Sequence, residues 1–592
     1  MIDLLEIQAL RGRWVRALLL LVLALLWGRF FFLQGLSGQD YMRHSEANAL
    51  RRIPVTAPRG LILDRDHRVL VDNRPSYSLF LIPYGFIADT AAVHRLAVIT
   101  GLEVDEINLR LLPGRSAPFR PIRLLRDMDF DTLTRIEEDR DALPGVYVQV
   151  EPVRAYGDSV RVSHVLGYVG EVSATELGDE NRRDLETGDL AGKQGIEKYY
   201  DVLLRGRRGY RYTLVDAVGR EIDHFGGRRD VAAVPGRNLQ LTLNRDLQRL
   251  AEMALVGKRG AIVALNPQNG EVLALASAPD FPLTVFARHL APAVWQALIH
   301  DAGHPLLNRA IQAQLPPGSI YKPVTTLAGL ETGQIDLSDT LTCTGGWPVG
   351  RRFYPCWKSE GHGPVSLIEA LAQSCNSYFY RLSLGLEFED WHRWGDRLGV
   401  GQKSGVDLPN EASGLLPASS YMDEKYGRGR WKRGQLANLA IGQGDLLVTP
   451  MQMAVLAALI GSGGRRVTPH LALSTETVDG GWRHIIPDST VLPIDSRWIA
   501  LIKAGMADAV NTPAGTAQAA KVRGVSVCGK TGSAQNPHGE SHAWFMGFAP
   551  MEAPEIAIAV MVEQGGSGGR SAAPLAGSLL RHHFGTGSTD DR

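Results

Sequence analysis

The chain carries Ser319-Ile320-Tyr321-Lys322 directly after a Pro-Pro-Gly turn, and this Ser-x-x-Lys motif constrains its architecture and chemistry most. A serine hydroxyl attacks a carbonyl only when a base within hydrogen-bonding distance takes its proton. If a helix opens after the turn, residues three positions apart share one face, which would place the Lys322 amine beside the Ser319 hydroxyl. The spacing therefore predicts a serine nucleophile and a lysine base.

A second motif, Lys530-Thr531-Gly532, follows an alternating apolar and polar segment and is predicted to lie on a strand. Lys322 can act as a base only if burial or a second cation lowers its pKa, and Lys530 is the candidate for that cation. Gly532 would let substrate backbone approach the sheet edge. Lys530, Thr531 and Ser533 would then bind a substrate carboxylate.

A third motif, Ser374-Cys375-Asn376, is expected in a loop between helices at 367–373 and 378–386. The Ser374 hydroxyl is predicted to relay a proton to the leaving amine. The Asn376 amide is predicted to hold a substrate amide. This loop would therefore face the nucleophile.

Each of the three motifs occurs by chance in many proteins, so none is diagnostic alone. Their presence in this order along one chain favours a serine acyl-transfer site. The backbone amides of Ser319 and Ser533 are the expected oxyanion hole of such a site.

The size and charge of the chain limit the classes of function. A length of 592 residues is too great for one domain and predicts two or three. The chain contains 63 basic and 63 acidic side chains, so no net charge draws it toward nucleic acid. A nucleic-acid partner is therefore not expected.

Residues 17–33 are apolar except for one glycine and Arg29, and they predict a membrane-spanning helix at 17–36. Three arginines precede this segment, whereas only Arg43 follows within a comparable distance, so residues 1–16 are expected in the cytoplasm and the rest outside. A cleaved signal peptide is the alternative, but no convincing small-x-small cleavage site follows the segment.

Two blocks follow the apolar segment. Residues 37–235 are rich in arginine and in short β-like runs, and they predict an extended, mainly β pedestal without a catalytic cluster. Residues 236–584 predict an α/β (α+β) domain with an antiparallel sheet flanked by helices, and 585–592 a disordered tail. The main expected elements of the second block are a helix at 245–256 and strands at 239–243, 261–265, 271–276, 543–548 and 555–562.

Both blocks carry further motifs that resemble those of class B penicillin-binding proteins over nearly the whole chain. The pedestal contains Arg59-Gly60-Leu61-Ile62-Leu63-Asp64-Arg65 and Gly195-Ile196-Glu197-Lys198-Tyr199, whose charged residues look structural. The second block contains His542-Ala543-Trp544-Phe545-Met546-Gly547-Phe548. The resemblance implies a penicillin-binding, serine β-lactamase-like transpeptidase fold on a pedestal.

The resemblance further implies a peptidoglycan D,D-transpeptidase. Ser319 would attack the penultimate D-alanine carbonyl of a stem peptide, release the terminal D-alanine, and pass the acyl group to an amine on a neighbouring stem. β-Lactams would acylate the same serine, and a carboxypeptidase side activity is compatible with it. No glycosyltransferase-like acidic motif precedes residue 235, which implies a RodA-type glycosyltransferase as a partner. Ser533 stands where threonine is commoner in the family, and it keeps a hydroxyl.

Three of the four cysteines form a group with one histidine: Cys343, Cys356, His362 and Cys375, spaced C-x12-C-x5-H-x12-C. A Cys3His set suits a structural zinc ion. A disulfide between the first two cysteines is the alternative, because an exported chain meets oxidising conditions. Elongation-type penicillin-binding protein 2 enzymes resemble this chain in carrying metal-binding side chains at matching positions. This likeness favours zinc, the elongation subtype and contacts of the pedestal with an MreC-like scaffold.

The same resemblance implies a single-pass protein of the cell inner membrane with a periplasmic catalytic domain. The alternatives are a division-type class B enzyme, a β-lactamase-like serine hydrolase and a β-lactam sensor. A β-lactamase needs a water-activating base, and no convincing deacylating glutamate is recognised. Sensors usually carry several spans or a cytoplasmic output module, which residues 1–16 are too few to form.

Overall fold

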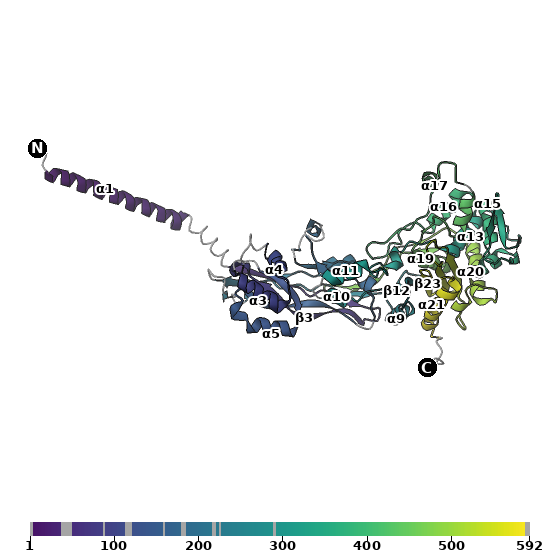
Figure 1. Ribbon diagram of the computed structural model, residues 1–592, viewed down its shortest axis with the longest axis horizontal. Helices are drawn as coiled ribbons and strands as arrows, with labels where there is room; N and C mark the ends of the chain where they lie inside the picture. Colours follow the sequence, from purple (N-terminus) through teal and green to yellow (C-terminus); the bar gives the residue numbers. More distant parts are fainter. Residues whose placement is uncertain are drawn as a thin grey trace.

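The structure is a computed structural model of the full-length chain. It describes residues 4–36, 50–86, 89–112, 121–157, 160–173, 175–178, 185–186, 188–215, 221–223, 227–287, 292–431 and 433–585. The molecule is elongated, with helix α1 (Leu4–Phe31) projecting from one end and most helices of the second block gathered at the other (Figure 1). The predicted tail lies outside the described residues except for Gly585.

Helix α1 is the one helix among the described residues that is long and apolar enough to cross a membrane. Its candidate span of 23 residues, Gly12–Gln34, rises about 35 Å, which exceeds the hydrocarbon thickness of about 30 Å. Its apolar side chains, such as Leu20 and Trp27, are exposed and pack against no other part of the described chain. The helix begins earlier than the predicted residue 17 because the preceding residues are mostly good helix formers.

The pedestal is built on a sheet whose longest strand is β3 (Val69–Leu81). This strand pairs antiparallel with β2 (Ile62–Leu63), β4 (Ile122–Met128) and β5 (Val146–Tyr156). Three helices pack on the end of this sheet around Leu79 and Leu81. They are α3 (Thr90–Thr100), α4 (Val104–Leu111) and α5 (Phe130–Glu138). The sequence analysis did not predict this helical layer, because each helix buries only one to three apolar residues.

A second, smaller sheet joins the pedestal to the segment that follows α1. Its order is β1-β8-β9, formed by Leu50–Val55, Gly209–Val215 and Glu221–Asp223. A further antiparallel pair consists of β6 (Val169–Glu171) and β7 (Leu190–Gly192). The pedestal thus consists of several short sheets held together by side chains.

A buried ion cluster connects these segments. The Arg59 guanidinium donates to Glu197 at 2.7 Å and to Asp201 at 2.9 Å, and Arg154 donates to Glu197 at 2.7 Å. Charged groups tolerate burial only when they are paired and hydrogen-bonded, as here. Arg154 lies on β5 and Glu197 on the short helix α7 (Gly195–Tyr199), so the charged pedestal motifs link distant parts of the chain.

We expect Glu197→Ala to lower the free energy of unfolding by about 3–5 kcal/mol, because it leaves two buried guanidinium groups without their carboxylate. The measurement is denaturant unfolding of the detergent-solubilised chain. The matched control is Glu137→Ala, which removes an exposed carboxylate 3.2 Å from Arg140 and should change stability by less than about 1 kcal/mol. Equal effects of the two substitutions would contradict the structural role of the cluster.

The pedestal sheet continues into the second block. Strand β2 pairs in parallel with β10 (Leu239–Leu241), β10 pairs with β18 (Ala472–Glu476), and β18 pairs with β19 (Trp482–His484). The strand predicted at 239–243 therefore belongs to the pedestal sheet and not to the sheet that carries the motifs. One hydrogen-bonded sheet therefore contains strands from both sides of the predicted boundary at 235.

The second block contains a five-stranded antiparallel sheet in the order β12-β11-β23-β22-β21. Helix α19 (Pro450–Gly461) covers one face, where Val263 is buried, and helices α9 (Arg245–Ala254) and α21 (Gly568–His583) cover the other, where Ile262 is buried. The strands are Gly260–Leu265 (β11), Val272–Ala278 (β12), Cys528–Ala534 (β21), His542–Ala549 (β22) and Ile556–Val562 (β23). The predicted antiparallel sheet flanked by helices is confirmed.

A group of helices lies beside the edge strand β21. Helix α20 (Ser496–Asn511) contacts β21, α13 (Lys322–Glu331) and α14 (Leu367–Ala372), so it joins the helices to the sheet edge. The remaining longer helices of this block are Pro292–His300 (α11), Asn376–Gly385 (α15), Phe388–Arg397 (α16), Ser419–Tyr426 (α17) and Arg433–Ala440 (α18). The three motifs lie where these helices meet the sheet.

Candidate active site

Ser319 lies in a one-turn 3-10 helix, η8 (Gly318–Tyr321), directly before helix α13. Gly318 has a φ of 56°, and its N–H donates to the Gly442 carbonyl at 2.8 Å. A Cβ at Gly442 would lie 2.0 Å from the Gly318 carbonyl oxygen, so glycine is required for this approach. Side chains three apart eclipse in such a turn, which favours Ser319 and Lys322 on one side. The printed hydrogen bonds of the Lys322 amine go to Ser374 and Asn376, so its predicted contact with the Ser319 hydroxyl stays a prediction.

The Lys322 amine connects the first and third motifs. It is fully buried and donates to Asn376 Oδ1 and to the Ser374 carbonyl, both at 2.8 Å, and to Ser374 Oγ at 3.2 Å. Ser319 Oγ has no hydrogen-bond partner among the residues that the structure describes. The predicted base therefore contacts the predicted relay group directly, and the predicted nucleophile has a free hydroxyl.

Ser374 occupies the tight connection between helices α14 and α15. Its φ is 56°, and its side chain is buried. Asn376 is the first residue of α15, so the connecting loop is shorter than predicted. The Trp357 indole N–H donates to the carbonyls of Gln373 and Ser374 at 3.1 and 3.2 Å, which fixes the backbone of this loop.

The Lys530-Thr531-Gly532 motif lies on the edge strand β21, as predicted. A Cβ at Gly532 would lie 2.7 Å from the Pro317 carbonyl oxygen, so the close neighbour of this glycine is the protein's own Pro-Pro-Gly turn. We had predicted that the missing side chain at Gly532 lets substrate backbone approach the sheet edge. Gln443, to which no role was assigned, donates to the Ser533 carbonyl at 3.2 Å and ties the motif strand to the loop that follows α18.

The two lysines share a buried, electrostatically coupled environment. Burial lowers the pKa of Lys322 to about 8. Burial, and then the charge of Lys322, lower the pKa of Lys530 well below its ordinary value. We had predicted that the charge of Lys530 lowers the pKa of Lys322. The structure instead gives an effect of Lys322 on the pKa of Lys530, whose buried amine donates to the Thr531 carbonyl at 3.1 Å. Burial and a protonated Lys322 therefore both disfavour the charged form of Lys530.

A cleft of about 1530 Å³ opens over the three motifs. Five of the predicted site residues line it: Ser319, Ser374, Asn376, Thr531 and Ser533. Both lysines are completely buried. Trp357 and Arg570 also line the cleft, and the sequence analysis did not predict them. Neither belongs to a motif of defined spacing, so the sequence alone held no signal for them.

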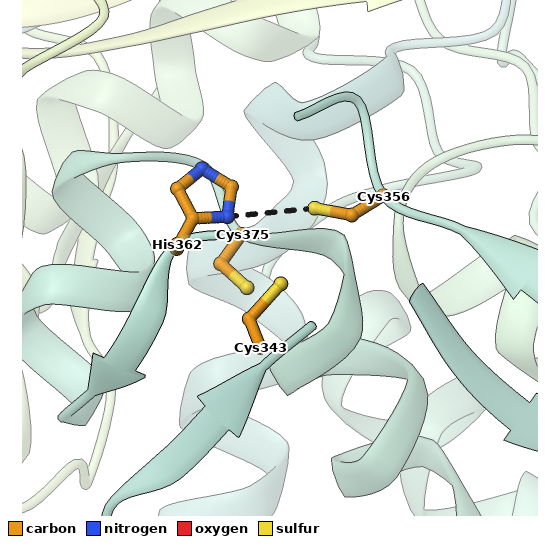
Figure 2. Close-up of side chains that lie close together, drawn as sticks. All are labelled: Cys343, Cys356, His362 and Cys375. Carbon is orange, nitrogen blue, oxygen red and sulfur yellow. Dashed lines mark hydrogen bonds between the residues drawn. The ribbon is translucent and has the colours of Figure 1, made fainter. Parts of the chain in front are cut away.

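A second cluster includes Cys375, the middle residue of the Ser-x-Asn motif (Figure 2). One ligand atom from each of Cys343, Cys356, His362 and Cys375 lies within 4.8 Å of the others. All four cysteines of the chain are free thiols in the structure. Cys356 Sγ lies 3.6 Å from His362 Nδ1 and accepts the Asn376 N–H at 3.3 Å, so the cluster touches the catalytic motif.

Comparison with known proteins agrees with this fold and site. The model for the penicillin binding protein transpeptidase domain matches residues 260–581, and that for the penicillin-binding protein dimerisation domain matches residues 54–241. Peptidoglycan D,D-transpeptidase MrdA of Acinetobacter baumannii is 32% identical over 96% of this chain and 87% of its own length. The MrdA protein of Escherichia coli K12 is 30% identical over 95% of this chain and 91% of its own.

Solved structures give the same result. The complex between penicillin-binding protein 2 and MreC from Helicobacter pylori matches with a TM-score of 0.79 and 29% identity, covering 91% of this chain and 99% of that chain. A chain of a peptidoglycan synthase complex matches with a TM-score of 0.71 and 30% identity, covering 99% and 100%.

A cleft lined by the serines of the Ser-x-x-Lys and Ser-x-Asn motifs, beside two buried lysines and the edge of a five-stranded sheet, defines a serine-type transpeptidase. The matches over both blocks name the family: the chain belongs to the penicillin-binding proteins. The prediction of a class B member similar to penicillin-binding protein 2 is confirmed.

Proposed function

We propose that the chain is a peptidoglycan D,D-transpeptidase that cross-links stem peptides during cell-wall elongation through an acyl-enzyme on Ser319. The observation that carries this proposal is the contact of the Lys322 amine with both Ser374 and Asn376 beside a cleft that exposes Ser319. The names of the relatives point to the same reaction.

In the first step, the neutral Lys322 amine takes the Ser319 proton as Oγ bonds to the penultimate D-alanine carbonyl carbon. The C–N bond to the terminal D-alanine then breaks, and the proton passes through the Ser374 hydroxyl, 3.2 Å from Lys322, to the leaving nitrogen. The backbone amides of Ser319 and Ser533 would stabilise the oxyanion. In the second step, an amine of a neighbouring stem attacks the ester, and Ser319 leaves with its proton restored.

Binding of the substrate carboxylate would determine which of the two lysines is protonated. It would bind beside Lys530, where Thr531 and Ser533 offer hydroxyls at the cleft wall. A negative charge there raises the pKa of Lys530 and favours its protonated form. A protonated Lys530 in turn disfavours the charged form of Lys322, whose neutral amine is the base.

Intact-mass measurement after exposure to penicillin, followed by peptide mapping, tests the proposal. We expect one long-lived adduct on the peptide that contains Ser319, because transpeptidases deacylate β-lactam adducts slowly. An adduct on another residue would contradict the nucleophile. Rapid turnover would instead favour a β-lactamase-like hydrolase.

We also propose a structural zinc ion held by Cys343, Cys356, His362 and Cys375. The size of the cluster and its three thiols with one imidazole fit four-coordinate zinc. The ion would supply cross-linking only. It would join β13 (Leu341–Cys343) to the start of α15 and so position the Ser-x-Asn motif from behind.

We expect one zinc per chain by metal analysis of the purified protein. Cys356→Ser should remove most of it and lower the melting temperature, because metal binding and folding of the cluster are coupled. Cys528→Ser is the matched control, since Cys528 is buried outside the cluster, and it should keep the full zinc content. A metal-free protein with a mapped disulfide between Cys343 and Cys356 would contradict the zinc site.

The proposed setting is the inner membrane, with α1 as a single-pass anchor and the catalytic domain in the periplasm. One apolar N-terminal helix supports this arrangement. We propose a RodA-type glycosyltransferase and an MreC-like scaffold as partners. The similar solved structures include a complex with MreC and a peptidoglycan synthase complex.

A further inference from the structure

The pedestal contains a cavity of about 500 Å³ that no step of the proposed reaction uses. It lies where the segment after β1, strands β4 and β5, and the segment before β8 come together. Among its described lining residues are seven arginines and a single acidic residue, Asp189. An excess of positive charge in a partly enclosed cavity attracts anions.

Most of these arginines have carboxylate partners. Glu197 and Asp201 form ion pairs with Arg59, Arg154 and Arg205, at nitrogen-to-oxygen distances of 2.7 to 3.1 Å. Glu151 accepts Arg123 at 2.7 Å, and Asp189 accepts Arg208. The structure gives no carboxylate contact to Arg126 or Arg207 within its described residues.

Arg126 is the most unusual member of the group. Its Nη2 donates to the Gly188 carbonyl at 3.2 Å, but its Nε is buried without a partner among the described residues. Burial and the adjacent Arg123 lower the pKa of Arg126 to about 10. A half-buried guanidinium without a carboxylate contact is poorly compensated, and an anion in the cavity would supply the missing charge.

Two further arginines of the cavity wall have donors without partners. Arg59 and Arg154 are 8% and 2% exposed, and each has one terminal nitrogen, Nη1 and Nη2 respectively, that is buried with no hydrogen bond to the described residues. These two nitrogens are closed to solvent and so do not reach a ligand in the cavity. The positive character of the wall comes from its arginines, which belong to separate segments around one space.

We propose that this cavity binds a phosphate or diphosphate group. Guanidinium groups bind phosphate oxygens through paired, charge-assisted hydrogen bonds. Lining arginines on β4, on β5 and in the segment before β8 suit a tetrahedral anion with several acceptor oxygens better than a planar carboxylate with two. The volume is within the range of small-ligand sites, about 300–1,000 Å³. The group could belong to a free phosphate compound or to a lipid headgroup, and the two sources share this chemistry.

The test is calorimetric titration of the detergent-solubilised full chain with inorganic pyrophosphate at constant ionic strength. We expect saturable binding that Arg126→Gln weakens at least tenfold. Arg483→Gln is the matched control, because Arg483 is exposed on β19 away from the cavity and carries the same charge, and it should bind as the wild type does. Penicillin acylation of Ser319 should be unchanged in both variants.

Thermal unfolding gives a second readout. Without pyrophosphate, Arg126→Gln should melt at or above the wild-type temperature, because it removes an unpaired buried charge. Pyrophosphate should raise the melting temperature of the wild type but not of the variant. If Arg126→Gln does not fold, Arg207→Gln replaces it, since Arg207 is exposed and should still weaken binding severalfold.

Reconstitution distinguishes the two sources of phosphate. Phosphatidylcholine vesicles with added phosphatidic acid should compete with pyrophosphate if a headgroup reaches the cavity, and should not compete if the ligand is a free phosphate compound. Absence of saturable pyrophosphate binding, or equal binding by Arg126→Gln, would overturn the proposal.

Discussion

Replacing Ser319 with alanine should abolish penicillin labelling and cross-linking, with a fall in acylation rate of about 10³-fold or more. Ser374 also contacts Lys322 and lines the cleft, so peptide mapping of the variant checks that it does not take over as nucleophile. The fold should survive, because Ser319 Oγ has no hydrogen-bond partner among the described residues and its loss leaves no group unpaired. Intact mass after penicillin exposure and a cross-linking assay with the partner polymerase measure the effect.

Ser541→Ala is the matched control for this substitution, because Ser541 lines the same cleft but belongs to none of the three motifs. It should label with penicillin at close to the wild-type rate. Equal melting temperatures of the two variants would show that any difference is chemical. Cross-linking retained by Ser319→Ala would remove Ser319 from the mechanism.

Replacing Lys322 with methionine should slow acylation by about 10²- to 10⁴-fold, the usual contribution of a positioned general base. Methionine matches the lysine in length but provides no base and loses the hydrogen bonds to Ser374 and Asn376. The control is Lys403→Met, which removes an exposed lysine outside the active-site cleft. Stopped-flow acylation with a reporter β-lactam measures both variants.

The dependence of acylation on pH should separate a base from a structural lysine. Burial lowers the pKa of Lys322 to about 8, and the neutral form is the active one. The wild-type rate should therefore rise with pH, level off above about pH 8, and fall about tenfold per pH unit well below it. Lys322→Met should lose this dependence together with its rate. A flat wild-type profile through this range would argue against Lys322 as the base.

Local sequence pattern predicted much of the fold because it reports on short-range geometry. Alternation placed strands within two residues of β11, β12, β22 and β23, and it placed the Lys-Thr-Gly motif on β21. Helices α3 to α5 escaped prediction, because short helices with narrow apolar faces have no clear periodicity. The strand at 239–243 was predicted, but its partner in the pedestal was not, because pairing depends on contacts across nearly two hundred residues.

The sequence by itself determined the family, the order of the three motifs and the candidate reaction, because motif spacing and residue type are properties of the chain. Only the tertiary structure decided that Lys322 contacts Ser374 and Asn376, that Gly532 faces the Pro-Pro-Gly turn, and that pedestal arginines surround a cavity. Side-chain contacts, burial and the resulting pKa values depend on which distant segments pack together. The spacing of residues along the chain does not indicate which distant segments pack together.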